Sequence, residues 1–219
     1  MADDLTLTRG QAAFKNAIRS LRPRPSLKTN PIEFSVGRVH YRIPRNYLTT
    51  MDDWSGGPQG LVTVTVNIPD MKPLSAETRA CFTTKATERP SDCEPLSFTI
   101  NAGSVVSAAE ALTNIKNLTH NQNPKTSSYG FQIYKVGPES ARTEYYTTSE
   151  NDRILLYACQ IFNNHGKRDG LCDPVGDRLP TGAAIHFFIG LRHLKDITQI
   201  DTRLRRLTEE FTVQPGDGG

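Results

Sequence analysis

The chain has 219 residues, of which 37% are hydrophobic, and its 26 basic and 23 acidic residues leave a net charge of +3. This composition predicts an ordered globular protein that buries about 70% of the surface of its unfolded chain. The well-mixed charges argue against a nucleic-acid-binding surface, and no apolar run approaches the roughly 18 residues of a membrane-spanning helix. We therefore expect neither a nucleic-acid partner nor a membrane span.

The first 31 residues predict a helical arm that leads into a linker. Apolar residues recur at helical spacing over Arg9–Leu21, and the two prolines of Arg22–Ser26 end this helix because proline cannot continue it. The opening residues Met1–Thr6 lack the basic start and apolar core of a signal peptide. They are typical of the mature end of a processed protein, so we expect that a signal or membrane anchor has been removed.

Residues 32–213 are expected to form a single α+β domain, followed by a flexible tail at 214–219. Strand patterns joined by turns and interrupted by helical patterns predict a mainly antiparallel sheet with helices packed on it. Two half-domains that divide near His120–Ser127 are the alternative.

Alternating apolar residues define the strands of this sheet. They predict a hairpin over Ile32–Ile43, with Gly37 at the first position of a tight II′ turn. The clearest strand is Leu61–Ile68, whose valines face the core and whose other face, formed by Thr63, Thr65 and Asn67, is open to water. Further strands are predicted over Leu96–Ile100, Tyr129–Val136, Thr143–Thr148, Arg153–Phe162 and Ala184–Leu191.

Three helices are predicted to pack on the sheet. A short helix opens at Pro73–Ser75 with Ser75 as its N-cap, and Ser104 caps a longer helix over Val105–Leu118. The last helix, Asp196–Phe211, has large apolar residues at intervals of three and four and charged residues on its other face. We expect this amphipathic C-terminal helix to dock on the sheet.

The four cysteines fall in two close pairs, Cys81 with Cys93 and Cys159 with Cys172. Each interval is polar and rich in turn residues, so its ends can come within disulfide distance. Zinc ligation and free thiols are the alternatives, although the C-x2-C or paired-histidine spacing of zinc sites is absent. We predict two local disulfides, the second of which ties a loop that contains Cys172 to a strand. Disulfides predict an oxidising compartment, so we expect a periplasmic or secreted protein.

The sequence contains no nucleophile elbow, metalloprotease motif, P-loop or dinucleotide fingerprint. Its five histidines have no spacing that demands a metal, so we expect neither a metal nor another cofactor. His186 lies within a predicted strand and is either a satisfied core histidine or a ligand on the sheet face.

Two polar loops are the candidate partner-binding elements. The first contains the only tryptophan of the chain, a residue type that is enriched at interface hot spots, although a tryptophan folded back over the core is the alternative. The second has mixed charge suited to steering a partner and would be held rigid by the second disulfide. The candidate binding residues are Asp52, Asp53 and Trp54 in the first loop and His165, Lys167 and Arg168 in the second.

The order of elements carries a resemblance to known proteins. The strand that ends at Ile43-Pro44, the strand at Leu61–Ile68, the meander and the final helix with Phe211 near its end form a pattern that resembles PsbP-like proteins. The pattern is also similar to bacterial envelope proteins that act as immunity partners of secreted antibacterial toxins. This likeness covers residues 32–211 and implies a protein that binds and blocks another protein or serves as an envelope accessory.

We therefore expect a non-enzymatic periplasmic or secreted binding protein, an immunity or inhibitor protein that binds and blocks a secreted antibacterial toxin. Its partner would be another protein. A secreted hydrolase with a site assembled from Asp52, Asp53, His165 and His186 is the alternative.

Overall fold

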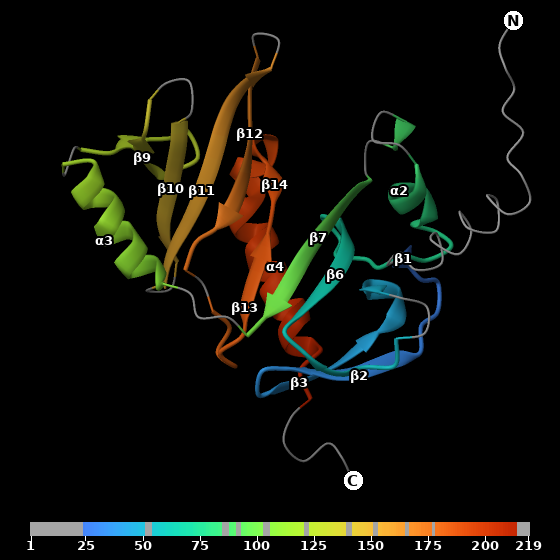
Figure 1. Ribbon diagram of the computed structural model, residues 1–219. Helices are drawn as coiled ribbons and strands as arrows, with labels where there is room; N and C mark the ends of the chain where they lie inside the picture. The colour runs from blue at the N-terminus through green and yellow to red at the C-terminus, as the bar shows by residue number, and fades with distance from the viewer. Residues whose placement is uncertain are drawn as a thin grey trace, which may run out of the picture.

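A computed structural model of the chain describes residues 24–50, 54–84, 88–90, 93–102, 106–120, 123–138, 142–150, 153–164, 167–176 and 178–213. The predicted helix at Arg9–Leu21 and the predicted tail at 214–219 lie outside the described residues. Figure 1 shows two groups of strands with the C-terminal helix α4 between them.

The largest sheet has six antiparallel strands in the spatial order β14-β12-β11-β10-β9-β8. These strands are β8 (Lys125–Thr126), β9 (Gln132–Val136), β10 (Arg142–Glu150), β11 (Arg153–Asn164), β12 (Lys167–Pro174) and β14 (Ile189–Gly190). A three-stranded antiparallel sheet in the order β13-β7-β6 comprises β6 (Leu61–Ile68), β7 (Glu94–Asn101) and β13 (Ala184–Phe187).

Two smaller groups of strands lie near the start of the chain. The first has the order β3-β2-β5, with β5 parallel to β2, and comprises β2 (Pro31–Val36), β3 (Val39–Pro44) and β5 (Gly57–Gln59). The second is the antiparallel pair of β1 (Arg24–Pro25) and β4 (Thr49–Thr50).

One stretch of chain joins the six-stranded sheet to the sheet of β6, β7 and β13. Residues Ala184–Phe187 pair with β7, and Ile189–Gly190, only one residue further on, pair with β12. The two sheets thus share an almost continuous strand and follow one another in the order from β6 to β8.

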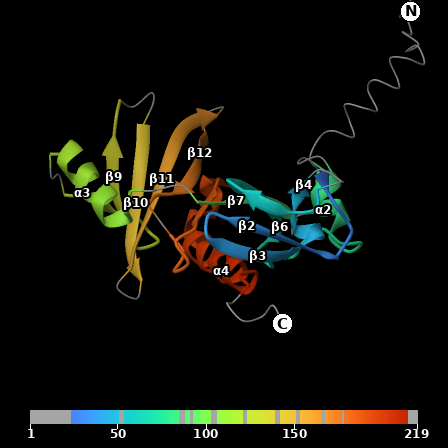
Figure 2. The ribbon, with the colours of Figure 1, turned by 60° about the horizontal axis from the view of Figure 1, so that its bottom comes forward.

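Helices cover both faces of the six-stranded sheet, because alternate strand residues are apolar on both sides. α3 (Ala108–Leu118) packs on the face that presents Leu156, whereas α4 (Ile197–Glu210) belongs to the core on the face that presents Leu155 and Tyr157. Figure 2 shows the two helices on opposite sides of the six-stranded sheet. We call the α3 side the outer face and the α4 side the inner face. The shorter helices are α2 (Arg79–Thr83) and the 3-10 helices η1 (Arg45–Tyr47) and η4 (Leu191–Asp196).

The main core lies against the inner face. Phe211, directly after α4, attaches to the first part of the chain at the edge of this core. The Arg42 N–H donates to the Phe211 carbonyl at 2.9 Å. The Phe211 ring packs edge-on against Tyr47, with 5.0 Å between ring centroids. The most deeply buried large side chains of the described residues include Tyr41, Ile43, Leu48, Phe98, Ile100, Leu155, Tyr157, Phe187, Ile197 and Leu204.

The predicted α+β class, the first hairpin and the C-terminal helix are confirmed. Gly37 has a φ of +61°, the left-handed conformation that the predicted turn requires, and a Cβ there would lie 2.9 Å from the Ala102 Cβ. α4 runs over Ile197–Glu210, within one residue of the predicted bounds at each end.

Two predicted helix starts are wrong. α3 begins at Ala108, because the Ser107 hydroxyl accepts a hydrogen bond from the Glu110 N–H at 3.2 Å and caps the helix three residues after Ser104. Ser75 does bond to the Thr78 N–H, at 3.2 Å, but the residues between them form a turn and α2 starts only at Arg79.

Two strand predictions also need correction. The polar face of β6 is not open to water, since Thr65 is buried and its hydroxyl bonds to the hydroxyls of Thr49 and Ser97, each at 3.0 Å. β9 begins at Gln132, later than predicted, because the Gly130 N–H donates to the Ser127 carbonyl in a turn.

A buried ion pair fixes α4 to the inner face. Asp201 is fully buried and accepts from Arg205 Nε at 3.0 Å, one turn further along the helix, and from Arg153 Nη2 at 3.1 Å on β11. The Tyr157 hydroxyl lies 3.4 Å from the same carboxylate. The helix is therefore held to the sheet by charge as well as by apolar packing.

We expect Asp201→Asn to lower the free energy of unfolding by about 3 kcal/mol, because it removes the buried negative charge to which Arg205 and Arg153 both donate. Glu210→Gln is the matched control, since it breaks the exposed Arg206–Glu210 pair of the same helix and should cost less than about 1 kcal/mol. Urea denaturation measures both. Equal effects of the two substitutions would contradict the anchoring role of Asp201.

Candidate interaction surface

The two predicted binding loops are only partly described. Asp52, Asp53 and His165 lie outside the described residues, and so does the side chain of Lys167. Trp54 packs on β2, at the opposite end of the molecule from the β11–β12 hairpin that contains Arg168 (Figure 1). The structure therefore does not bring Trp54 and Arg168 into one site.

Trp54 covers the core. Its ring lies 5.4 Å from that of Phe34, centroid to centroid, and it packs as a partly buried residue against the main core. Its carbonyl accepts a hydrogen bond from Arg45 Nη2 at 2.5 Å. These contacts favour the alternative in which the tryptophan folds back, and a role for Trp54 in partner binding stays a prediction.

Arg168 is part of an internal charge network. Its guanidinium contacts the carboxylate of Glu144, a side chain only 2% exposed, and donates to the Tyr146 hydroxyl at 2.9 Å. The Tyr146 hydroxyl in turn donates to Glu144 Oε2 at 2.6 Å. Burial, reinforced by the neighbouring Glu144, raises the pKa of Tyr146 above its usual range. Arg168 thus holds β12 against β10 on the inner face.

The segment predicted as a loop before Cys172 is a strand. β11 and β12 form a long hairpin in which Cys159 and Cys172 are directly opposite each other. The structure contains the predicted Cys159–Cys172 disulfide, but the bond links two neighbouring strands and does not fasten a loop. The hairpin continues past Gly170 because that residue has no side chain, and a Cβ there would lie 2.6 Å from the Gln160 carbonyl oxygen.

Three large apolar side chains are exposed on the outer face, where no helix covers them. Phe162 on β11, Leu171 on β12 and Phe188 between β13 and β14 are 46%, 48% and 57% exposed. Leu171 pairs with Gly190, and Phe162 pairs with Asp169, two residues before Leu171. Diagonal neighbours of this kind lie within reach of one another, so the three side chains form a stripe across the strands, which we call the outer strip.

The strand switch explains the exposure of Phe188. Its neighbours Phe187 and Ile189 point into the core, so strand alternation turns Phe188 outward. Phe188 also belongs to neither β13 nor β14, because the chain there passes from pairing with β7 to pairing with β12.

A half-buried ion pair lies beside the strip. His186 Nε2 is 3.5 Å from Asp173 Oδ2, and the His186 ring packs edge-on against Phe188 with 4.8 Å between centroids. Burial raises the pKa of Asp173 above its usual value, and His186 offsets part of that shift. His186 therefore lies on the sheet's outer face, the position that the second alternative predicts, and pairs there with Asp173.

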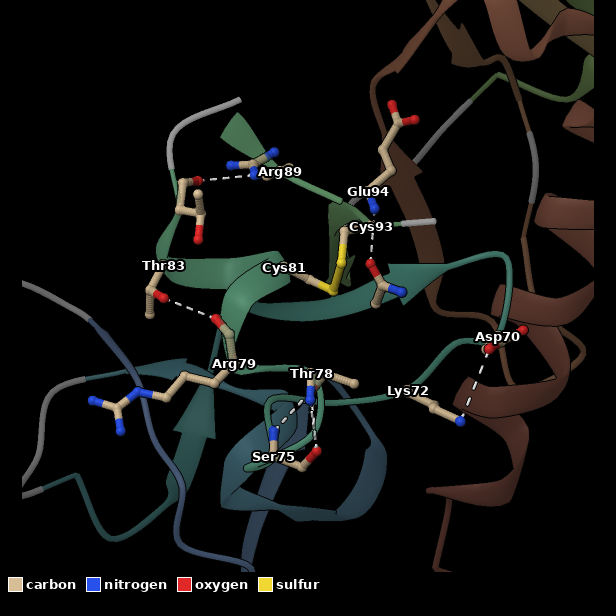
Figure 3. Close-up of a disulfide and its surroundings, with 12 residues drawn as sticks. Asp70, Lys72, Ser75, Thr78, Arg79, Cys81, Thr83, Arg89, Cys93 and Glu94 are labelled. Atoms are coloured by element: carbon tan, nitrogen blue, oxygen red, sulfur yellow. Dashed lines mark hydrogen bonds and ion pairs between the residues drawn. A yellow bond between two sulfur atoms is a disulfide. The ribbon is translucent and has the colours of Figure 1, made fainter. Parts of the chain in front are cut away.

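The other disulfide, Cys81–Cys93, ties α2 to the start of β7, as Figure 3 shows. Next to it, the Glu94 carboxylate contacts Arg192 Nη2 at 2.5 Å and His193 Nε2 at 2.6 Å, at the edge of a pocket of about 360 Å³ between β6 and α4. Both carboxylate oxygens of Glu94 are engaged, so we assign this residue to anchoring η4 against β7.

The described residues contain no group of three or more histidine, cysteine, aspartate or glutamate side chains that could hold a metal ion. Within the same part of the chain, no helix is long and apolar enough to cross a membrane. Of the four residues in the hydrolase alternative, only His186 is described. The two disulfides fit a protein of an oxidising compartment, outside the cytoplasm.

Comparison with known proteins gives a result at the level of the fold. The sequence matches no protein-family model, and it matches no curated protein. Smlt3025, an immunity protein of the Stenotrophomonas maltophilia type IV secretion system, has a similar structure, with a TM-score of 0.60 and 16% identity over 85% of this chain and 94% of that one.

A second similar structure is FrpD, the iron-regulated outer membrane lipoprotein of Neisseria meningitidis. Its TM-score is 0.58, with 12% identity over 86% of this chain and 96% of that one. At such identities the likeness shows a shared fold. The similarity of fold confirms the predicted resemblance to immunity proteins. Nothing in these comparisons supports the predicted resemblance to PsbP-like proteins.

Sequence reasoning missed every residue of the outer strip. Phe162 was expected to end a strand, and Leu171 was expected to lie in a loop. No alternation of apolar and polar residues marks β12, where Leu171 and Asp173 share one face. Their exposure on a common face follows only from the register of β11, β12 and β14.

We expect Trp54→Ala to lower the free energy of unfolding by about 2 kcal/mol or more, because it removes the cover over Phe34. Leu61→Ala, which truncates an exposed strand residue, should change it by less than about 0.5 kcal/mol. Chemical denaturation compares the two. A stable Trp54→Ala protein with weakened partner binding would instead support the binding interpretation of the first loop.

The raised pKa of Asp173 predicts the sign of a pH effect. Because ionisation of Asp173 is harder in the folded state than in the unfolded state, this group's contribution is favourable at low pH and is lost as the pH rises through its folded pKa. The stability of Asp173→Asn relative to the natural protein should therefore increase between about pH 3 and pH 6. Urea denaturation across this range measures the difference, and a decrease would show that the His186 pair outweighs burial.

Proposed function

We propose that the protein is a non-enzymatic binding protein of the cell envelope, periplasmic or secreted, and that it acts as an immunity or inhibitor protein that binds and blocks a secreted antibacterial toxin. The observation that carries this proposal is the outer strip. Exposed apolar side chains that lie together on one face mark interaction sites in soluble proteins, whereas single ones are common and need no explanation. Phe162, Leu171 and Phe188 lie together.

The strip is also rigid. Phe162 and Leu171 stand on paired strands, and the Cys159–Cys172 disulfide joins these two strands on the opposite face of the sheet. A surface that is already ordered in the free protein loses little conformational entropy when it binds, so more of the contact energy appears as affinity. This arrangement suits tight inhibition better than it suits turnover of a substrate.

Two further observations support the proposal. The fold is similar to that of Smlt3025, which is an immunity protein of a secretion system. The two disulfides favour a compartment outside the cytoplasm, where secreted toxins meet their targets.

The charges beside the strip indicate the kind of surface that it fits. Asp169 and Asp173 flank Leu171 on the same side of β12, and His186 lies against Asp173. A toxin surface that combines an apolar patch with a lysine or arginine complements this pattern.

The test asks first whether a gene beside the one for this chain encodes a secreted toxin, and then measures binding to that toxin together with the growth of bacteria exposed to it. The natural protein should bind the toxin and protect the cells. Leu171→Ser combined with Phe188→Ser should weaken binding by at least about 30-fold, because hot-spot truncations cost about 2 kcal/mol or more. Leu118→Ser is the control, since Leu118 is 66% exposed on α3, away from the strip.

The possible results test the immunity function and the contact surface separately. If the natural protein neither binds the toxin nor protects cells, the immunity function is wrong. If the double variant binds as tightly as the natural protein and the control, the function stands but the strip is not the contact surface. Circular dichroism melting confirms that each variant is folded.

A further inference from the structure

The pocket of about 360 Å³ beside Glu94 has the size of a ligand site, since such pockets measure roughly 300–1,000 Å³. It lies between α4 on one side and the paired end of β6 and start of β7 on the other. The side chains at intervals of three and four along a helix share one face, and one such stripe of α4 and the residue before it lines the pocket. The stripe consists of Asp196, Gln199, Ile200 and Arg203.

The floor of this pocket is apolar. Ile68 ends β6 and Ile200 lies on α4, and these two lining residues are only 3% and 4% exposed. Pro69, directly after β6, also lines the pocket. Aliphatic groups in such a position favour an apolar part of a ligand, because the contact removes apolar surface from water.

Charges of opposite sign stand at the two ends of the stripe. Asp196 and Arg203 are seven residues apart, which separates their backbones by about 10 Å at the rise of a helix. Asp196 lies 3.9 Å from Lys195, but both side chains are exposed, and such a pair contributes at most about 1 kcal/mol. Arg203 Nη1 donates to the Pro69 carbonyl at 2.7 Å, which positions the guanidinium and uses one of its five N–H groups.

The wall opposite the stripe adds no further selective charge. Glu94 and His193 line the pocket there, but His193 contacts one oxygen of the Glu94 carboxylate and Arg192 contacts the other. The pocket therefore combines an apolar floor with a carboxylate at one end and a guanidinium at the other.

We propose that this pocket binds a short peptide with free ends, in a role beyond the proposed function of the outer strip. The ammonium group of the peptide pairs with Asp196, and its carboxylate pairs with Arg203, whose planar fork suits a carboxylate. An extended chain spans about 3.5 Å per residue, so three residues match the separation of the two charges, whereas a single amino acid is too short. The middle side chain rests on Ile68 and Ile200, so an aliphatic residue fits there.

The test measures binding of the tripeptide alanyl-leucyl-alanine to the full chain by isothermal titration calorimetry, with the N-acetylated and the C-amidated forms for comparison. The free peptide should bind, and each blocked form should bind at least ten-fold more weakly, because it lacks one charge-assisted contact. Asp196→Asn should weaken binding of the free peptide at least ten-fold but leave binding of the acetylated form unchanged. Arg203→Gln should weaken binding of the free peptide equally but leave the amidated form unchanged.

Matched controls lie on the same helix. Glu210→Gln and Arg206→Gln remove the same charges from an exposed pair outside the pocket and should change the affinity less than two-fold. Leu171→Ser combined with Phe188→Ser should also leave peptide binding unchanged, so the pocket is tested independently of the outer strip. Circular dichroism melting shows whether each variant is folded.

Absence of binding by the natural protein at millimolar peptide would overturn the inference. Equal affinity for the free and the blocked peptides would overturn it as well, because the charged ends would then play no part. If Asp196→Asn or Arg203→Gln weakened the free peptide and the corresponding blocked peptide to the same extent, the substitution would have disturbed the pocket in general and the assigned pairing would be wrong.

Discussion

The strand at residues 184–190 is the constraint on which the rest of the structure depends. Its first half completes the sheet of β6 and β7, and its second half forms the edge of the six-stranded sheet beside β12. Since η4 and α4 follow immediately, the same strand delivers the C-terminal helix to the inner face. Phe188, at the point where the pairing partner changes, is turned outward and becomes part of the outer strip. Residues 184–190 thus determine both how the two sheets are joined and where Phe188 of the outer strip is exposed.

The two faces of the β11–β12 hairpin have different chemistry for a simple reason. Strand alternation sends Cys159 and Cys172 inward, where they form the disulfide, and sends Phe162 and Leu171 outward, where no helix covers them. α3 protects only the part of the outer face around Tyr134 and Leu156. The hairpin therefore presents Phe162 and Leu171 to solvent on its outer face, while the disulfide joins its two strands on the inner face.

Local patterns were sufficient to predict the elements that depend on neighbouring residues. The hairpin at Gly37, the strand Leu61–Ile68, the helix Asp196–Phe211 and the pairing of the cysteines all follow from short-range spacing, and the structure contains them. The error at Ser104 arose because Ser107, three residues later, is an equally plausible cap. The error at Ser75 arose because its hydrogen bond to the Thr78 N–H closes a turn and does not begin a helix.

The candidate surface could not be predicted in the same way, because it depends on register between distant segments. The sequence predicts Arg168 as a loop residue that contacts a partner. Nothing in the sequence indicates that its guanidinium contacts the carboxylate of Glu144, 24 residues earlier. Leu171 was assigned to a loop because the glycines and polar residues around it are typical of turns. Only the pairing of β12 with both β11 and β14 reveals that it lies between Phe162 and Phe188.

Hydroxyl-radical footprinting of the protein, free and bound to the toxin proposed as its partner, tests the central claim most directly. The outer strip predicts that oxidation of Phe162, Leu171 and Phe188 slows strongly in the complex, while Leu118, at 66% exposure on α3, reacts at an unchanged rate. Unchanged oxidation of the three strip residues, with protection instead around Trp54, would contradict the account and place the contact on the first predicted loop.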